Sequence, residues 1–187
     1  NQRPWMSHRV SEDLAIIGVD ANMKVAIVHY WFVTWRGGEK VIEELLRLYP
    51  QADVYTHVAT PEIEREHLAG HRVFRTFVSK LPGARRLYQK YLPFMPIALE
   101  QLDLTGYDLV ISSESGPAKN VISDPDALHV CYCHTPMRYV WDMYRLYLDG
   151  AGRLTRLLMR PLMHYMRIAD SVSAARVDHF IANSAFI

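Results

Sequence analysis

Short apolar runs separate longer amphipathic stretches along this chain, and the two patterns predict different elements. Continuous short apolar runs are typical of strands that are buried on both faces in a parallel sheet. We predict strands at residues 25–28, 53–58, 72–76, 107–112, 128–133 and 178–182. Helical stretches lie between most of them. The sequence therefore predicts an α/β fold, a Rossmann-like open and mostly parallel sheet with helices on both faces.

The clearest helical stretch follows the glycine pair Gly37-Gly38. Its apolar residues at positions 41, 42, 45, 46 and 49 recur at the spacing of one helix face. Glu43 and Arg47 are four residues apart on the outer face, and Pro50 ends the pattern. We predict further helices at 61–68, in broken form over 82–104, and at about 153–176.

Residues 1–22 differ from the rest of the chain because they are polar apart from one apolar patch at 14–19. Met23-Lys24-Val25 resembles a natural start just before a strand, so we interpret residues 1–22 as an N-terminal extension. The alternative is an extra edge strand at 14–19. Residues 23–187 have the length of one domain. Because the chain stops directly after the last predicted strand, we expect that a C-terminal domain is absent.

Composition narrows the class of protein. The 187 residues carry a formal net charge of +1, which gives no general attraction for nucleic acid. The two cysteines, Cys131 and Cys133, lie on the same face of a predicted strand, so a disulfide between them is strained. We therefore expect reduced thiols and a cytoplasmic protein. No apolar run approaches the ~20 residues of a membrane span, which leaves a soluble or peripheral membrane protein.

Candidate binding groups follow several predicted strands, at the carboxyl ends where open α/β sheets bind their ligands. Gly37 and Gly38 open a helix whose backbone N–H groups and dipole favour phosphate, although the same pair also suits a plain turn. No GxGxxG motif is present, which disfavours a nicotinamide-dependent enzyme. The fourth predicted strand is followed by Glu114, Ser115 and Lys119, which suit a ligand-binding loop or a solvated turn.

The stretch 130–142 holds the densest set of reactive side chains. It starts as an apolar strand and reaches His134 just beyond the strand end. Thr135 and Pro136 then predict a helix with Thr135 as its N-cap. The candidate acceptor-binding or supporting groups beyond it are Arg138, Tyr139 and Asp142. Zinc is disfavoured because His134 is expected on the face opposite both cysteines, so we expect no metal site.

The helix predicted at 153–176 is amphipathic in an unusual way. Its basic residues share one face and its leucines lie mostly on another. The basic face consists of Arg153, Arg156, Arg160, His164 and Arg167. A basic amphipathic helix binds anionic lipid, and each arginine near the surface contributes about 1 kcal/mol. A solvated helix face has the same pattern, so both interpretations stand.

Three segments resemble a known family. Residues 23–28 followed by 37–41 are similar to the start of the retaining, family-four glycosyltransferases. Residues 131–142 resemble the matching block of their bacterial mannosyltransferase-like branch, which builds surface polysaccharides. Residues 181–186 resemble the strand that closes their first domain. The resemblance covers about residues 23–187.

This resemblance implies half of a GT-B fold, namely the N-terminal, acceptor-side domain. It implies transfer of a hexose, with mannose as the first guess, from a nucleotide-diphosphate sugar to a glycan or polyprenyl-linked acceptor, with no metal or other cofactor. Gly37 and Gly38 would lie against the donor diphosphate, and His134 would hydrogen-bond the transferred sugar. The donor-side domain would hold the nucleotide, so this chain alone is expected to be inactive. The family acts at the cytoplasmic membrane face, which favours lipid contact for the basic face at 153–167.

A non-catalytic Rossmann-like module, which binds a ligand or tethers a complex to a membrane, is the alternative hypothesis. Sugar transfer requires one imidazole beside a glycine-lined helix start, whereas a tethering module does not. The position of His134 relative to Gly37 and Gly38 therefore separates the two hypotheses.

Overall fold

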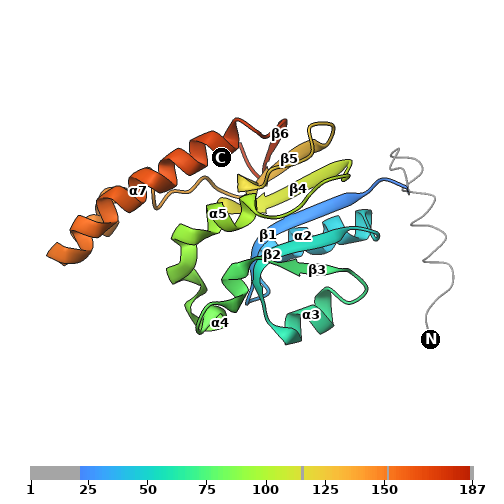
Figure 1. Cartoon of the computed structure of the whole chain (residues 1–187), viewed down its shortest axis with the longest axis horizontal. Helices are drawn as coiled ribbons and strands as arrows, with labels where there is room; N and C mark the ends of the chain where they lie inside the picture. The colour runs from blue at the N-terminus through green and yellow to red at the C-terminus, as the bar shows by residue number, and fades with distance from the viewer. Residues whose placement is uncertain (1–21, 115, 151, 186–187) are drawn as a thin grey trace.

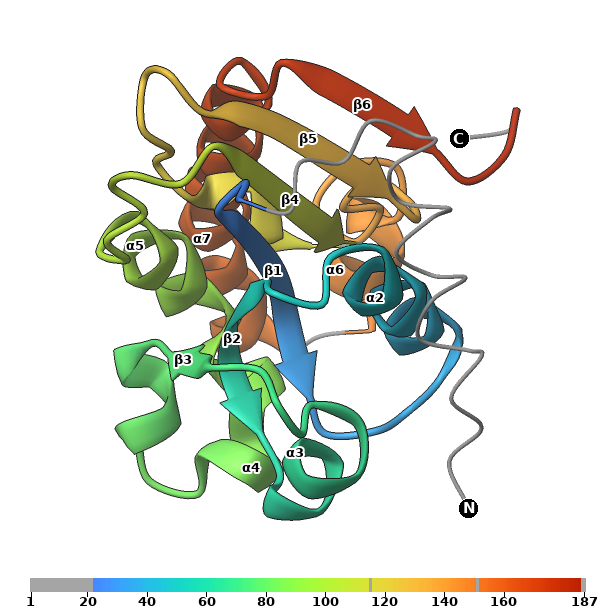
Figure 2. The same ribbon diagram turned by 90° about the vertical axis from the view of Figure 1, so that its right-hand side faces the viewer.

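The computed structural model describes residues 22–114, 116–150 and 152–185, and their six strands form one parallel sheet (Figure 2). The order is β3-β2-β1-β4-β5-β6, and every neighbouring pair is parallel. The strands are β1 (Val25–Phe32), β2 (Asp53–Ala59), β3 (Val73–Arg75), β4 (Leu109–Glu114), β5 (Leu128–Cys133) and β6 (His179–Ala182). The predicted α/β class is confirmed. The predicted extension and its alternative edge strand lie outside the described residues, apart from Asn22.

Helices cover both faces of the sheet (Figure 1). α2 (Gly37–Leu48) and α3 (Pro61–His67) pack against one face, where Val25 and Ile27 of β1 meet Ile42 of α2. α5 (Met95–Glu100) and the 3-10 helix η3 (Pro117–Asn120) cover the other face, which receives Ala26 and Val28. Successive residues of β1 thus enter opposite core clusters, as expected for a central parallel strand. The remaining helices are η1 (Phe77–Lys80), α4 (Ala84–Leu87), η2 (Tyr88–Phe94), α6 (Tyr144–Asp149) and α7 (Arg153–Ala174).

β1 is twice as long as the apolar run that predicted it, because it continues through His29 and Tyr30 to Phe32. His29 pairs with Thr56 of β2 on one side and with Ser113 of β4 on the other. The chain winds outward from β1 in one direction to β3 and from β4 in the other direction to β6. The carboxyl ends of β1 and β4 therefore form the topological switch point, where open sheets bind ligands.

The helix predicted at Thr135 and Pro136 does not form. Residues 138–143 fold as a series of turns instead, and α6 begins only at Tyr144. Met137 and Val140 are fully buried in a cluster with Met166 of α7. Tertiary packing of these two residues under α7 thus overrides the local capping preference of the Thr-Pro step.

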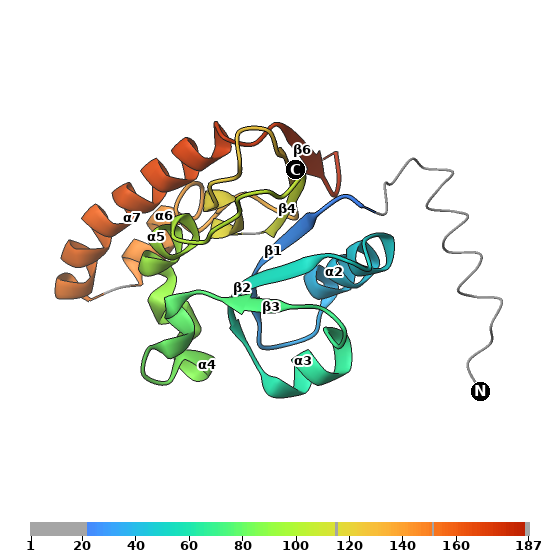
Figure 3. The same ribbon diagram turned by 45° about the vertical axis from the view of Figure 1, so that its right-hand side comes forward.

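α7 is a long helix that extends beyond the sheet (Figure 3), and a buried ion pair joins it to η3. Lys119 Nζ of η3 donates to Asp170 Oδ1 of α7 at 2.6 Å, and Trp141 Nε1 donates to Asp170 Oδ2 at 2.8 Å. The Lys119 and Asp170 side chains are only 7% and 14% exposed. Three separate segments therefore meet at one carboxylate.

Candidate active site

The start of α2 and His134 lie side by side at the carboxyl ends of β1, β4 and β5, hereafter the carboxyl rim. A Cβ atom on Gly38 would lie 3.8 Å from His134 Nε2 and 3.8 Å from the Tyr30 hydroxyl. His134 directly follows β5 and is half-buried. The imidazole and the glycine-lined helix start therefore lie at one place on the rim.

The backbone conformation at Gly37 and Gly38 does not demand glycine. Positive φ angles among the described glycines occur only at Gly70, Gly83 and Gly106, so Gly37 and Gly38 adopt backbone angles open to other residues. A Cβ atom on Gly37 would meet nothing within 4 Å. Glycine here leaves open space over the first N–H groups of a helix, and such groups bind phosphate.

Ser113 of β4 orients the His134 ring. Its Oγ lies 2.8 Å from His134 Nε2, so this ring nitrogen has a hydrogen-bond partner within the protein. Burial lowers the pKa of His134 below its ordinary value, and the neighbouring His29 lowers it further, while Glu39 opposes the shift. His134 is thus held as a neutral imidazole near pH 7, suited to hydrogen bonding.

His29 and Glu39 lie beneath the helix start, and the sequence pattern did not single them out. His29 is fully buried, and its Nδ1 donates to the Ser113 carbonyl oxygen at 3.0 Å. Its Nε2 lies 3.9 Å from Glu39 Oε1. Glu39 Oε2 accepts from the Arg36 backbone N–H at 2.9 Å. Burial by itself raises the pKa of Glu39, but His29 and the backbone N–H groups bring it below its usual value, so the carboxylate stays ionised.

A comparison with known protein families assigns the chain to a family. Residues 35–187 match the family described as Glycosyltransferase Family 4. The chain belongs to this glycosyltransferase family. Neither a curated protein nor a solved structure matches the chain. The parallel six-stranded sheet fits a glycosyltransferase domain of the GT-B type, which binds a sugar donor and an acceptor.

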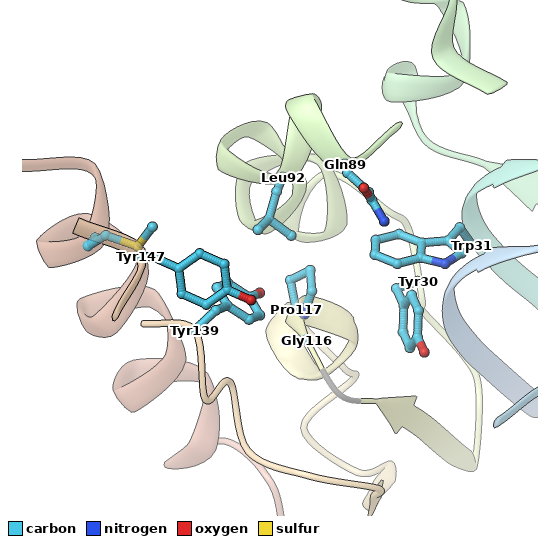
Figure 4. Close-up of a pocket in the computed structure, with 9 residues that line it drawn as sticks. Tyr30, Trp31, Gln89, Leu92, Gly116, Pro117, Tyr139 and Tyr147 are labelled. Carbon is cyan, nitrogen blue, oxygen red and sulfur yellow. The ribbon is translucent and has the colours of Figure 1, made fainter. Parts of the chain in front are cut away.

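A cavity of about 440 Å³ opens next to the carboxyl rim of this glycosyltransferase domain (Figure 4). Tyr30 and Trp31 of β1 form one side, and Tyr139 and Tyr147 form the opposite side. The other lining residues are Gln89, Leu92, Gly116, Pro117 and Met163. Of these nine residues, the sequence analysis had singled out only Tyr139. The others come from elements far apart in the chain, and only the fold brings them together.

The segment after β4 was predicted as a possible ligand-binding loop, but its Lys119 is buried inside the protein. Lys119 is buried with its ammonium group on Asp170, so the geometry gives it a role in fixing α7. Ser115 lies outside the described residues, and of Glu114 only the backbone at the end of β4 is described. Acceptor binding by these residues stays a prediction.

Arg138 and Asp142 contact each other on the surface. Arg138 Nε donates to Asp142 Oδ2 at 3.0 Å, with both side chains about half exposed. An exposed pair of this kind contributes little to stability. Both groups therefore remain available to a ligand, and their role as supporting residues stays a prediction.

The arginines predicted on the basic face of α7 differ in their contacts: two of them bond to backbone carbonyls of the protein and two are exposed. Arg156 donates to the backbone carbonyls of Leu148 and Asp149, and Arg167 donates to the carbonyl of Val140 at 2.9 Å. Arg153 and Arg160 are exposed.

Four leucines on α6 and α7 are the most exposed large hydrophobic side chains among the described residues. This leucine ridge consists of Leu146, Leu154, Leu157 and Leu158, each more than 60% exposed.

Proposed function

We propose that this domain is the acceptor-side half of a retaining glycosyltransferase. The enzyme moves a hexose, mannose-like in our hypothesis, from a nucleotide-diphosphate sugar to a glycan or lipid-linked acceptor. The observation that carries the proposal is the position of His134 Nε2 beside Gly38, at the switch point of a family-four sheet. A tethering module has no need for this pairing of imidazole and phosphate-binding helix start.

In the proposed reaction, the residues of the carboxyl rim have different roles. The start of α2 receives the donor diphosphate over the open space at Gly37 and beside Gly38, which faces His134 and Tyr30. His134, neutral because its pKa is lowered, hydrogen-bonds the transferred sugar near the reacting carbon. As the bond to the leaving phosphate breaks, positive charge develops on the sugar ring. The acceptor oxygen bonds to the anomeric carbon on the face that the phosphate leaves, and the departing phosphate accepts the proton of that hydroxyl, so the anomeric configuration is kept. This scheme involves no metal.

A second domain completes the proposed enzyme. In our proposal, it forms the far wall of the cleft and holds the nucleotide, while the rim described above holds the diphosphate and the acceptor. The 187-residue chain alone is therefore proposed to bind ligands but not to turn over.

A transfer assay tests the proposal. The full-length protein is expected to release nucleoside diphosphate from GDP-mannose or UDP-glucose only when a lipid-linked or glycan acceptor is present. The product is expected to keep the anomeric configuration of the donor, which NMR of the new linkage shows directly. Inversion at the anomeric carbon, or failure to use any nucleotide-diphosphate hexose, contradicts the proposal.

Attachment to a membrane surface is a second function that one observation favours. The leucine ridge lies on α6 and α7, and exposed basic residues flank it: Arg145, Arg153 and Arg160. Apolar side chains beside cations suit the boundary of an anionic bilayer. None of the described helices has the length and hydropathy needed to cross a bilayer. From the exposed leucines and arginines we propose peripheral binding to a membrane surface, and from the family resemblance we propose its cytoplasmic face.

Vesicle binding checks this second function. Replacing Leu154, Leu157 and Leu158 together by serine is expected to reduce co-sedimentation with vesicles containing phosphatidylglycerol at least tenfold. The reason is that each buried leucine contributes about 1.5 kcal/mol or more. A matched control replaces Leu48 and Ile97, which are also exposed but lie on other helices. Equal retention of the ridge variant and the control variant contradicts membrane binding through the ridge.

A further inference from the structure

The histidine beneath the start of α2 has one ring nitrogen in a hydrogen bond and one without a partner. His29 is fully buried, and its Nδ1 lies 3.0 Å from the Ser113 carbonyl oxygen. A carbonyl oxygen only accepts hydrogen bonds, so Nδ1 carries a proton. His29 Nε2 is buried without a hydrogen-bond partner among the described residues, and Glu39 Oε1 lies 3.9 Å from it. A neutral ring would turn an Nε2 lone pair toward this carboxylate, whereas a doubly protonated ring turns an N–H group toward it.

The surroundings of His29 favour the doubly protonated ring. Glu39 supplies the carboxylate that faces it, and the rings of Tyr30 and Phe32 pack against it with centroids 4.3 Å and 4.9 Å away. Burial raises the pKa of Glu39 and lowers that of His134, and a positive charge on His29 lowers both. An imidazolium at this position therefore agrees with an ionised Glu39 and a neutral His134.

Glu39 by itself is placed unfavourably for a phosphate site. Its carboxylate is buried and accepts from the backbone N–H of Arg36, directly before the glycine pair. A negative charge at this helix start repels an incoming diphosphate and opposes the helix dipole. The side chains of Arg36 and Lys40 are exposed, so water and salt screen their charges. His29 is the buried cation at this place, and a Cβ atom on Gly38 would lie 3.9 Å from its Cε1.

We propose that His29 is a positioning residue of the diphosphate site, held as an imidazolium by Glu39 so that no uncompensated negative charge remains beneath the glycine pair. The inference rests on the transferase function proposed above and specifies how its donor site is kept neutral. His29 is fully buried and touches neither sugar nor diphosphate, so it acts through Glu39. Loss of the His29 charge leaves Glu39 alone beneath the donor, whereas loss of both charges makes the site neutral again.

Three variants of the 187-residue chain test this charge balance. His29→Asn removes the charge and keeps an amide N–H near the position of Nδ1. Glu39→Gln removes the opposite charge and keeps an oxygen for the Arg36 N–H, because glutamine also serves in a capping box. The third variant combines both changes. The controls are His57→Asn, at a fully buried histidine of β2, and Glu44→Gln, at an exposed carboxylate of α2. Thermal unfolding shows that each variant is folded.

Calorimetric titration with inorganic pyrophosphate at about pH 7 is the first measurement. We expect His29→Asn to bind pyrophosphate at least about tenfold more weakly than the unmodified chain, because Glu39 is then unbalanced. The double variant should recover most of this loss, and Glu39→Gln alone and both controls should bind as tightly as the unmodified chain. An equal loss in His29→Asn and in the double variant makes His29 a purely structural residue and overturns the proposal. Unchanged binding by His29→Asn also overturns it.

NMR of the imidazole nitrogens is a readout that needs no ligand. In the unmodified chain, both ring nitrogens of His29 should carry protons at about pH 7, and Glu39→Gln should convert the ring to the form with one proton. A ring with one proton in the unmodified chain overturns the proposal, whether or not His29→Asn folds.

Transfer by the full-length protein separates this proposal from the one on which it rests. Transfer that His29→Asn reduces and the double variant recovers supports both. Transfer that His29→Asn leaves unchanged refutes the charge balance alone. If the unmodified protein transfers no hexose, but its pyrophosphate binding depends on a doubly protonated His29, sugar transfer is refuted and the charge balance of an anion site is kept.

Discussion

Replacing His134 by alanine is expected to reduce transfer by the full-length enzyme about 10²–10³-fold, the usual cost of losing one hydrogen bond made to developing charge. The ring is half-buried, with one hydrogen bond to Ser113 Oγ and a tilted contact with the Tyr132 ring, so the fold should persist. Steady-state rates with thermal unfolding curves measure both effects. His179→Ala is the matched control, since His179 is exposed on β6, away from the rim. Near-normal turnover of His134→Ala removes this residue from the mechanism.

The pH profile adds a second readout for His134. Burial lowers the pKa of His134 below the ordinary histidine value of 6.5, so the ring is protonated at a lower pH than an exposed histidine. The His134-dependent loss of transfer should therefore appear only on the acid side of pH 6.5. A loss centred above pH 6.5 contradicts the neutral imidazole.

Replacing Gly38 by leucine is expected to weaken donor binding at least tenfold while leaving the protein as stable as before, or more stable. A larger side chain enters the space beside His134 Nε2 and the Tyr30 hydroxyl, where the diphosphate is proposed to lie. The first turn of a helix gains up to about 1 kcal/mol when glycine is replaced by a better helix former. Calorimetric titration with nucleotide-diphosphate hexoses and thermal unfolding measure the two effects separately.

Gly152→Leu is the control for this experiment, because Gly152 also lies at the start of a helix, directly before α7, and a Cβ atom there would meet nothing within 4 Å. If Gly38→Leu binds the donor as tightly as the control does, the start of α2 is not the diphosphate site. A large loss of stability would show instead that the space at Gly38 is needed by the protein itself.

Local sequence patterns predicted the elements that depend on local and periodic signals. β5 was predicted with its observed bounds, and α2 begins at the predicted glycine pair and ends before Pro50. The broken helical character of residues 82–104 was also predicted, because Pro93 and Pro96 remove backbone donors. In each case the deciding residue lies within the element itself.

Features that depend on the partners of an element escaped the sequence analysis. The run ending at Val28 gave no sign that β1 continues through His29, because a buried histidine needs a specific acceptor, here the Ser113 carbonyl. The Thr-Pro step predicted a helix, but Met137 and Val140 are buried under α7. Similarly, no spacing rule shows that Lys119 pairs with Asp170, fifty-one residues later.

The proposed reaction site and the neighbouring cavity are built from different elements, and this affects which acceptors related enzymes can use. The groups beside the proposed reacting carbon sit on strand ends and on the first turn of α2, which the parallel sheet fixes together. Four of the nine residues that line the neighbouring cavity come instead from η2, α6 and α7: Gln89, Leu92, Tyr147 and Met163. Exchanging these outer segments between related enzymes should therefore transfer preference for one acceptor over another while the preference for the sugar donor stays unchanged.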